Sequence, residues 1–453
     1  MRTINSTFTL KNQETKTKKT KIGEPKTKKQ TIKLQFKYKH IKHHFYICKT
    51  SLTQQNELML YLWFGGNLMV NETSPNINKK YIVEILRNLI KTKPINPPGQ
   101  EEEAALIIKE ELEKLGAKTT LDYVKPKRPN VIGIFDEEED KGTTLLFNGH
   151  TDVVPPGPNW TIDPFEGIVK DGKVYGRGAV DMLGGLAATL GAIKTVIDSG
   201  YEFKGRLLYT AVIAEETGGD GAIKLMEDGI KADYAYVSEP SDLEIRIAER
   251  GLIWFKIKCI GEAAHASTPH LGINAIEVLT KALLAIKDIK YDYEPHEFLG
   301  YHTFNIGLIK GGVKTNIVAP ECEATIDIRT PPSLSFKTVE EKIRNVLRSF
   351  EEIYGAKFDL QVIATADPFE LDKNSEIVRF TCKAFKEALD MEPRIGGMLG
   401  ATDGRFFVKA GIPTVILGPG PEDNAHKADE YVEIDSLVKL AKIYTQIILK
   451  TLT

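Results

Sequence analysis

The chain has 453 residues, of which 27% are charged and 42% hydrophobic, with a formal net charge of -2. This composition is typical of a globular protein large enough for two or three domains. No apolar run reaches the length of a membrane span, and the most apolar one, residues 58–70, is too short and contains two glycines. Four scattered cysteines, Cys48, Cys259, Cys322 and Cys382, form no CxxC pair. A zinc finger and a thioredoxin-like motif are thereby excluded, and free thiols in the cytoplasm are expected.

Residues 1–68 differ from the rest of the chain. They contain 14 Lys and Arg against 3 Asp and Glu, whereas the remaining residues contain 46 against 59. The polar, Lys-rich residues 1–57 lack apolar periodicity, which predicts disorder. A second hypothesis is that residues 1–68 are an untranslated extension and that Met69 is the start. Two glycine codons shortly before Met69 would be guanine-rich, as a ribosome-binding site is.

From Met69 onward, helices and strands alternate. A helix with Ser74 or Asn76 as its cap is expected over residues 81–90. The following elements are predicted in chain order: a helix at 101–115, strands at 130–135 and 144–148, a helix at 183–197, a strand at 206–213, a helix at 222–227 and a strand at 234–238. This alternation indicates an α/β domain with a mainly parallel sheet.

The rhythm changes near residue 251. A strand at 253–260, a helix at 274–286, strands at 302–309 and 322–329, a helix at 336–353 and a strand at 357–363 follow one another. This β-α-β-β-α-β order is ferredoxin-like. We therefore expect a catalytic domain in two parts, residues 69–250 and 367–453, with residues 251–366 inserted as a smaller domain. The second part contains a helix at 374–389, a strand at 413–417 and a helix at 434–449.

Histidines and carboxylates follow the predicted strands. His150 and Asp152 follow one strand and Asp181 precedes a helix of small residues, whereas the later members of the set are Glu215, Glu216, Glu239 and His426. In an open α/β sheet, ligands bind beyond the carboxyl ends of the strands, so these segments should share one crevice. Two histidines and several carboxylates suit zinc, and a bridging carboxylate suits two metal ions. One member of the Glu215–Glu216 pair could ligate while the other acts as a base.

This ordered set of motifs resembles the metallopeptidase family that includes acetylornithine deacetylase, succinyl-diaminopimelate desuccinylase, aminoacylase-1 and the glutamate carboxypeptidases. The resemblance spans residues 80–452. It implies two Zn²⁺ or Co²⁺ ions per subunit and a cis-type peptide after Asp181. By resemblance, the metal ligands are His150, Asp181 as the bridge, Glu216, Glu239 and His426, whereas Glu215 is the general base and Asp152 orients His150.

The resemblance extends into the inserted domain. His265, in the run Gly261 to Pro269, is expected to reach the active site, often that of a dimer partner, and to stabilise the oxyanion. The substrate contacts implied by resemblance are Asn316, Arg329, Gly400, Ala401 and Thr402. Arg329 suits a substrate carboxylate because a guanidinium binds it through two hydrogen bonds.

The sequence thus predicts a metal-dependent deacylase that removes a succinyl or acetyl group from an N-acylated amino acid. The desuccinylase and acetylornithine deacetylase branches, in lysine and arginine biosynthesis, are favoured, with a slight preference for the desuccinylase. Three alternatives remain open: a di- or carboxypeptidase of the same fold, a nucleic-acid-binding protein that uses the basic arm, and an inactive binding protein. The acidic charge after residue 68 argues against nucleic acid, and the filled ligand positions argue against an inactive protein. A homodimer formed through the inserted domain is expected, with no membrane partner.

Overall fold

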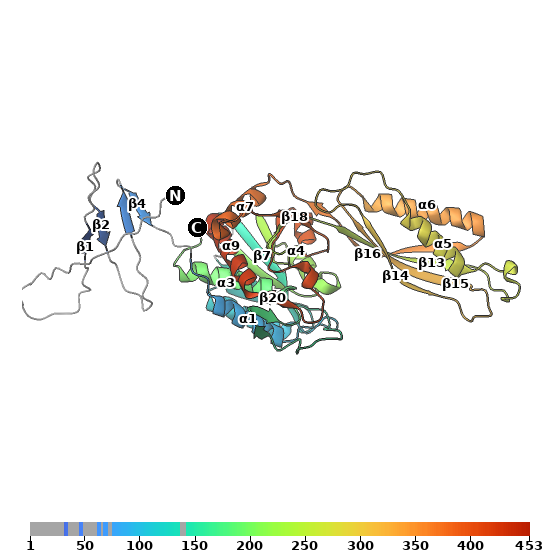
Figure 1. The fold of residues 1–453 in the computed structure, drawn as a ribbon, viewed down its shortest axis with the longest axis horizontal. Coiled ribbons are helices and arrows are strands. Elements are labelled where there is room, and N and C mark those ends of the chain that lie inside the picture. Colours follow the sequence, from blue (N-terminus) through green and yellow to red (C-terminus); the bar gives the residue numbers. More distant parts are fainter. Residues whose placement is uncertain (1–30, 35–44, 49–60, 65–66, 71–74, 136–141) are drawn as a thin grey trace, which may run out of the picture. The chain divides into compact units, whose positions relative to one another are not determined.

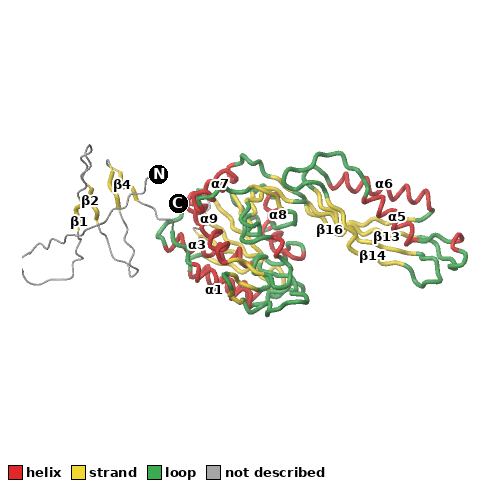
Figure 2. Tube along the Cα trace, viewed as in Figure 1, coloured by secondary structure: helices red, strands yellow, loops and turns green. Residues whose placement is uncertain are grey.

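The computed structural model describes residues 31–34, 45–48, 61–64, 67–70, 75–135 and 142–453, drawn as ribbon and tube in Figures 1 and 2. The chain divides into two units, Met1–Thr73 and Ser74–Thr453. In the first unit, β1 (Thr31–Leu34) pairs with β2 (Phe45–Cys48), and β3 (Tyr61–Phe64) pairs with β4 (Asn67–Val70). The other residues of the segment 1–57, for which disorder is predicted, lie outside the described residues. Ser74, one of the two predicted caps, also lies outside them.

A nine-stranded mixed sheet organises the second unit. Its strands, in spatial order, are β17 (Phe369–Glu370), β12 (Ile245–Glu249), β19 (Thr414–Ile416), β11 (Tyr234–Val237), β7 (Thr144–His150), β10 (Arg206–Val212), β6 (Arg128–Phe135) and β5 (Lys118–Lys125), with β18 (Ile395–Met398) beside β12. The central strands β19, β11, β7 and β10 are parallel, whereas β6 and β5 are antiparallel additions. The carboxyl ends of the four central strands therefore meet at one edge.

Helices cover both faces of this sheet, which explains why its central strands are apolar throughout. One core contains Phe147 and residues from α1 (Lys79–Lys91), α2 (Glu102–Lys114), α3 (Leu183–Asp198), α7 (Glu376–Leu389) and α9 (Ile434–Leu452). The opposite core contains Leu146 and residues from α4 (Asp220–Glu227) and α8 (Gly404–Lys409). Adjacent residues of β7 thus point to opposite faces, as the pleat of a strand requires.

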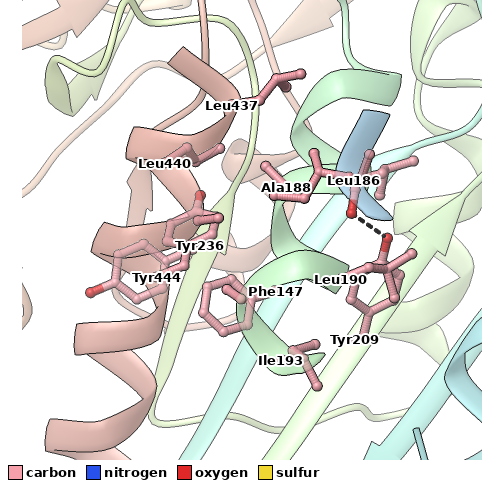
Figure 3. Packing of buried hydrophobic residues seen from close by; sticks show 14 of the residues in the cluster. Phe147, Leu186, Ala188, Leu190, Ile193, Tyr209, Tyr236, Leu437, Leu440 and Tyr444 are labelled. Atoms are coloured by element: carbon pink, nitrogen blue, oxygen red, sulfur yellow. Dashed lines mark hydrogen bonds between the residues drawn. The ribbon is translucent and has the colours of Figure 1, made fainter. Parts of the chain in front are cut away.

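Aromatic rings fix the centre of the larger core. Figure 3 shows Phe147 beside Tyr236 and Tyr444, with ring centroids 5.5 Å and 4.7 Å away. The Tyr209 hydroxyl donates a hydrogen bond of 3.2 Å to the Leu186 carbonyl of α3. A Cβ atom on Gly185 would stand 2.2 Å from the Ser238 carbonyl oxygen. Glycine therefore lets α3 approach the loop after β11, which carries Glu239.

The inserted domain is an antiparallel sheet with two helices on one face. Its elements, in chain order, are β13 (Gly251–Ile260), α5 (Ala275–Lys287), β14 (Thr303–Gly311), β15 (Glu321–Thr330), α6 (Phe336–Tyr354) and β16 (Lys357–Ala366). The spatial order β14-β15-β13-β16 is that of a ferredoxin-like fold. The predicted fold class, a mainly parallel catalytic sheet with a ferredoxin-like insertion, is confirmed.

Three differences from the sequence prediction have local causes. The side chain of Asn78, which accepts a hydrogen bond of 3.0 Å from the Tyr81 amide, caps α1, so the prediction of Asn76 as the cap was wrong. The sequence prediction missed β5, whose polar and charged residues mask its alternation, and β12, where Arg246 interrupts the apolar pattern.

Among the described residues, no helix is both long and apolar enough to cross a membrane.

Candidate metal centre and active site

The segments that follow the central strands converge at one edge of the sheet. His150 is the last residue of β7, Glu215 and Glu216 begin a short 3-10 helix after β10, and Glu239 follows β11. The turn after β10 is sharp because Ala214 has a left-handed φ of 62°. His426 lies in the loop after β19, also with a left-handed φ of 62°. Such conformations in non-glycine residues persist where the surroundings enforce them, which is common at functional sites.

His150, Asp181 and Glu239 form the first group of possible metal ligands. The Nε2 atom of His150 lies 3.3 Å from Asp181 Oδ1 and 3.4 Å from Glu239 Oε1. The other ring nitrogen, Nδ1, is 2.8 Å from the Asp152 carbonyl oxygen. Donation of Nδ1–H to this carbonyl fixes the tautomer and leaves Nε2 free to coordinate an ion.

Asp181, Glu216 and His426 form the second group. The Nε2 atom of His426 lies 3.2 Å from Asp181 Oδ2 and 3.1 Å from Glu216 Oε1. Asp181 therefore belongs to both groups, with one carboxylate oxygen directed at each histidine. Hydrogen bonds that His426 donates to Asp181 and then to Glu216 raise the pKa of His426 to about 10.

The donor set fits divalent cations. Asp181, Glu216 and Glu239 are largely buried together with His150, and unpaired buried carboxylates are costly. Burial raises the pKa of Glu239 to about 8; His150 acts against this rise, whereas Asp181 adds to it. A cation would offset this repulsion, and imidazole nitrogens with carboxylate oxygens are typical zinc ligands.

The Asp152 carboxylate contacts the glutamate pair that follows β10. Its Oδ1 accepts the Glu215 amide N–H and its Oδ2 accepts the Glu216 amide N–H, both at 3.2 Å. The Oδ1 atom is 3.6 Å from His150 Nδ1, beyond hydrogen-bonding distance, so the backbone carbonyl of Asp152, and not its carboxylate, contacts the imidazole. The carboxylate instead fixes the backbone that carries the glutamate pair.

Asn96, which the sequence analysis missed, supports Asp152. Its buried side-chain amide donates hydrogen bonds of 2.8 Å to Asp152 Oδ2 and to the Thr217 hydroxyl. Its backbone N–H donates to the Val153 carbonyl at 2.9 Å. Asn96 lies before two prolines and a glycine, a pattern that indicates a turn and carries no signal of a catalytic contact.

A buried ion pair between Arg177 and Glu430, also missed, fixes the bridging residue. Glu430 Oε1 accepts the backbone N–H groups of Val180 at 3.0 Å and of Asp181 at 3.3 Å. Arg177 also donates to the His426 carbonyl at 3.2 Å. The ion pair thus holds the backbone of two ligands of the second group: Glu430 holds that of Asp181, and Arg177 holds that of His426. The peptide bond between Asp181 and Met182 is cis, as the family resemblance implies.

Glu215 belongs to neither ligand group. Its Oε2 is 4.0 Å from His150 Nε2, and its Oε1 is 3.9 Å from Arg405 Nη1. Burial raises the pKa of Glu215 well above its ordinary value; His150 opposes this effect, whereas Glu239 and other neighbouring carboxylates add to it. A carboxyl group with a raised pKa beside a ligand cluster is suited to accept and return a proton.

A pocket of about 790 Å³ opens onto this cluster. It is lined by both ligand groups' carboxylates, by Glu215, and by Arg329, Gly400 and Ala401 from the predicted substrate contacts. Leu252 and Trp254 of β13 add apolar surface from the inserted domain. Thr402 is not part of the lining: it is buried, and its hydroxyl donates to Glu249 Oε2 at 2.6 Å.

Two predicted residues of the inserted domain lie elsewhere. His265 follows the end of β13 that is remote from Gly251, and it forms an isolated bridge with Ile317, next to Asn316. Ten strand residues separate this region from the pocket end of β13, a span of roughly 30 Å. The structure therefore does not bring His265 and Asn316 to the pocket of their own chain, whereas Arg329, opposite Leu252, does line it.

The chain belongs to the peptidase family M20/M25/M40, whose model matches residues 146–450. It is 30% identical to an N-formyl-4-amino-5-aminomethyl-2-methylpyrimidine deformylase from Halalkalibacterium halodurans, with 81% of this chain and 93% of the relative covered. It is 32% identical to a succinyl-diaminopimelate desuccinylase from Marinobacter nauticus, over 69% and 85% of the two chains. A tripeptidase from Staphylococcus aureus has a TM-score of 0.71 and 26% identity, over 83% and 99%. The predicted family and its hydrolase activity are confirmed.

Replacing Asn96 tests its support of the glutamate pair. Asn96→Ala leaves one oxygen of Asp152 with a weaker hydrogen-bond set, so kcat should fall by roughly tenfold with a smaller change in KM. Steady-state kinetics and a titration of metal affinity would measure both effects. Asn274→Ala, which removes a helix cap in the inserted domain, is the matched control and should lower only the melting temperature. Equal kinetic losses in the two variants would contradict the positioning role.

Proposed function

We propose that this protein is a metal-dependent amidohydrolase that removes a succinyl or acetyl group from an N-acylated amino acid. The observation that carries the proposal is the pair of ligand groups that share Asp181, with Glu215 beside them and Arg329 in the same pocket. A substrate amide and a substrate carboxylate thus have matching groups in one pocket.

The metal assignment follows from the ligand chemistry. His150, Asp181 and Glu239 would hold one ion, and Asp181, Glu216 and His426 would hold a second, with zinc or cobalt as the expected metals. Divalent ions in such a set polarise a carbonyl and lower the pKa of water.

The residues of the chain account for the proton transfers. Glu215 accepts a proton from the attacking water as the new C–O bond forms. It then delivers that proton to the nitrogen as the C–N bond breaks, which releases a carboxylate and an amine. Asp152 keeps Glu215 and Glu216 in register through their backbone amides. Arg329 binds the substrate carboxylate, although Asp327 already accepts its hydrogen bonds at 2.8 Å and 3.1 Å and would have to share it.

The relatives support a deacylase but differ in the acyl group. The Marinobacter nauticus relative is named for a desuccinylation, which favours the lysine branch of amino-acid biosynthesis for this chain. The relative from Halalkalibacterium halodurans is named for a deformylation, so formyl derivatives deserve testing. The cytoplasmic location expected from the scattered cysteines stays a prediction.

A peptidase is the second candidate function. The match to the tripeptidase, at 26% identity, covers 99% of the tripeptidase chain. A short peptide offers the same amide and carboxylate as an acylated amino acid. The same ligand groups and the same base would serve both reactions.

A substrate panel separates these candidates. We expect the zinc- or cobalt-loaded enzyme to hydrolyse N-succinyl-diaminopimelate or N-acetylornithine faster than N-formyl amines, dipeptides or tripeptides, and to lose this activity on chelation. Amine release would be measured at equal substrate concentrations. Faster cleavage of the peptides would contradict the deacylase and favour the second candidate.

Glu215→Gln tests the assignment of the base. The substitution preserves shape but removes the proton acceptor, so kcat should fall by about 100-fold or more while metal content is retained. Metal analysis and single-turnover kinetics would be compared with those of Glu227→Gln, an exposed control on α4. Activity within a few fold of the unmodified enzyme would remove Glu215 from this role.

We further propose a homodimer that forms through the inserted domain. β14 is an edge strand, and its Leu308 and Ile309 side chains are 70% and 55% exposed. Apolar side chains on an unpaired edge favour association with a second strand. Such a dimer would let His265 and Asn316 serve the pocket of the partner.

Complementation tests this shared site. Chains with His265→Ala and chains with Glu215→Ala should each be inactive, yet their mixture should regain activity once subunits exchange, because one site of each mixed dimer is intact. Sedimentation would show whether Leu308→Lys yields monomers. No recovery in a mixture shown to contain mixed dimers would contradict the proposal.

A further inference from the structure

Glu422 lies on the wall of the active-site pocket, although it belongs to neither ligand group. It begins the short 3-10 helix Glu422–Asn424, four residues before His426. The same residue also lines a smaller side pocket of about 390 Å³, together with Arg246, Glu244 and Gly396. Glu422 therefore lines both the reaction pocket and this side pocket.

One carboxylate oxygen of Glu422 is anchored. Arg246 Nη1 donates to Glu422 Oε2 at 2.6 Å and also lies 2.7 Å from the Met398 sulfur. The Arg246 side chain is only 11% exposed, so it is a firm support for the carboxylate. The anchoring fixes the direction of the second oxygen without a contact from the substrate.

The second oxygen, Oε1, lies beside Gly400 of the predicted substrate loop. A Cβ atom on Gly400 would lie 3.5 Å from Oε1, so the glycine leaves that side of the oxygen uncovered. No described residue donates a hydrogen bond to Oε1. The Glu422 side chain is 32% exposed, which leaves it accessible from the pocket.

The other charged groups nearby do not neutralise this oxygen. Arg246 is shared between Glu422 and Glu244, whose Oε2 is 3.5 Å from Arg246 Nε. Among the arginines that line the pocket, Arg329 pairs with Asp327, and Arg405 donates to the Thr402 carbonyl and faces Glu215. The imidazole of His426, which also lines the pocket, contacts Asp181 and Glu216. Glu422 Oε1 is thus an anionic acceptor whose complement is a positively charged donor.

We propose that Glu422 is a specificity-determining residue that binds a cationic group of the substrate. The preferred substrate is then an acylated diamino acid whose second, free ammonium group donates to Oε1. This inference rests on the proposed function, because it concerns the amine half of the same amide. It is independent of which acyl group is removed.

Paired substrates test the inference directly. Nα-acyl-lysine and Nα-acyl-norleucine carry the same acyl group and the same four-carbon side chain, and they differ by a terminal ammonium group in place of a hydrogen atom. The metal-loaded enzyme should show a kcat/KM at least roughly tenfold higher for the lysine derivative, as expected for one charge-assisted hydrogen bond. Glu422→Gln should abolish this preference, mainly by raising the KM for the lysine derivative. The kcat/KM for the norleucine derivative should stay nearly the same.

Two further variants separate recognition from folding. Glu422→Asp keeps the charge and should retain part of the preference. Glu297→Gln removes a carboxylate that lines only the side pocket and pairs with Lys373, so the preference should be unaffected. An increase in salt should weaken the lysine derivative's advantage and leave the norleucine derivative's rate unchanged.

The possible outcomes are distinct. A preference lost in Glu422→Gln and kept in Glu297→Gln supports the inference. Equal rates for the two substrates in the unmodified enzyme, or an equal loss for both in Glu422→Gln, overturn it while leaving the deacylase intact. Hydrolysis of neither derivative contradicts the proposed function; in that case, tripeptides with lysine or norleucine at one position, assayed at each position in turn, give the same ratio test for Glu422.

Discussion

The architecture of the site depends on one carboxylate, that of Asp181, which lies between two histidines. One oxygen is 3.3 Å from His150 and the other is 3.2 Å from His426. Burial alone would raise the pKa of Asp181, but the hydrogen bonds from His150 and His426 hold it below its ordinary value. The parallel strands deliver His150, the glutamate pair, Glu239 and His426 to one edge of the sheet, and Asp181 joins them into two groups.

The surrounding polar groups act mainly on the backbone. Glu430 accepts the amide of Asp181, Arg177 donates to the carbonyl of His426, and Asp152 accepts the amides of Glu215 and Glu216. Ligand positions are set more firmly in this way than by side-chain contacts alone, because a fixed backbone restricts every rotamer that it carries. The ligand groups are therefore preorganised by interactions that do not themselves occupy coordination positions.

Local sequence patterns predicted the fold class and the segments whose histidines and carboxylates lie together, whereas the individual roles in the ligand set rest on the family resemblance. His150 follows an apolar run that has the length of a β-strand. The other predicted ligands follow strands or precede a helix of small residues. Parallel-strand geometry then predicts that they meet. By contrast, Asn96 meets Asp152 across 56 residues, and Arg177 meets Glu430 across 253. No periodicity or local spacing encodes such contacts, so they could not be predicted from the sequence.

Residue roles in the inserted domain were harder to predict, because a motif identifies a residue but not the pocket it serves. Arg329 lines the pocket of its own chain, whereas His265 lies about one strand length away. Similarly, Glu422 carries no motif, and its importance follows only from the anchoring by Arg246 and the bare backbone of Gly400.

The most direct test of the account is the metal content of three proteins: the unmodified chain, His426→Ala and Asp181→Ala, each loaded with zinc and then dialysed. If Asp181 is the shared ligand, the unmodified chain should retain two ions per subunit after dialysis, and His426→Ala should retain one. Asp181→Ala should retain neither ion under the same dialysis conditions. Two tightly held ions in Asp181→Ala would contradict the shared-carboxylate account.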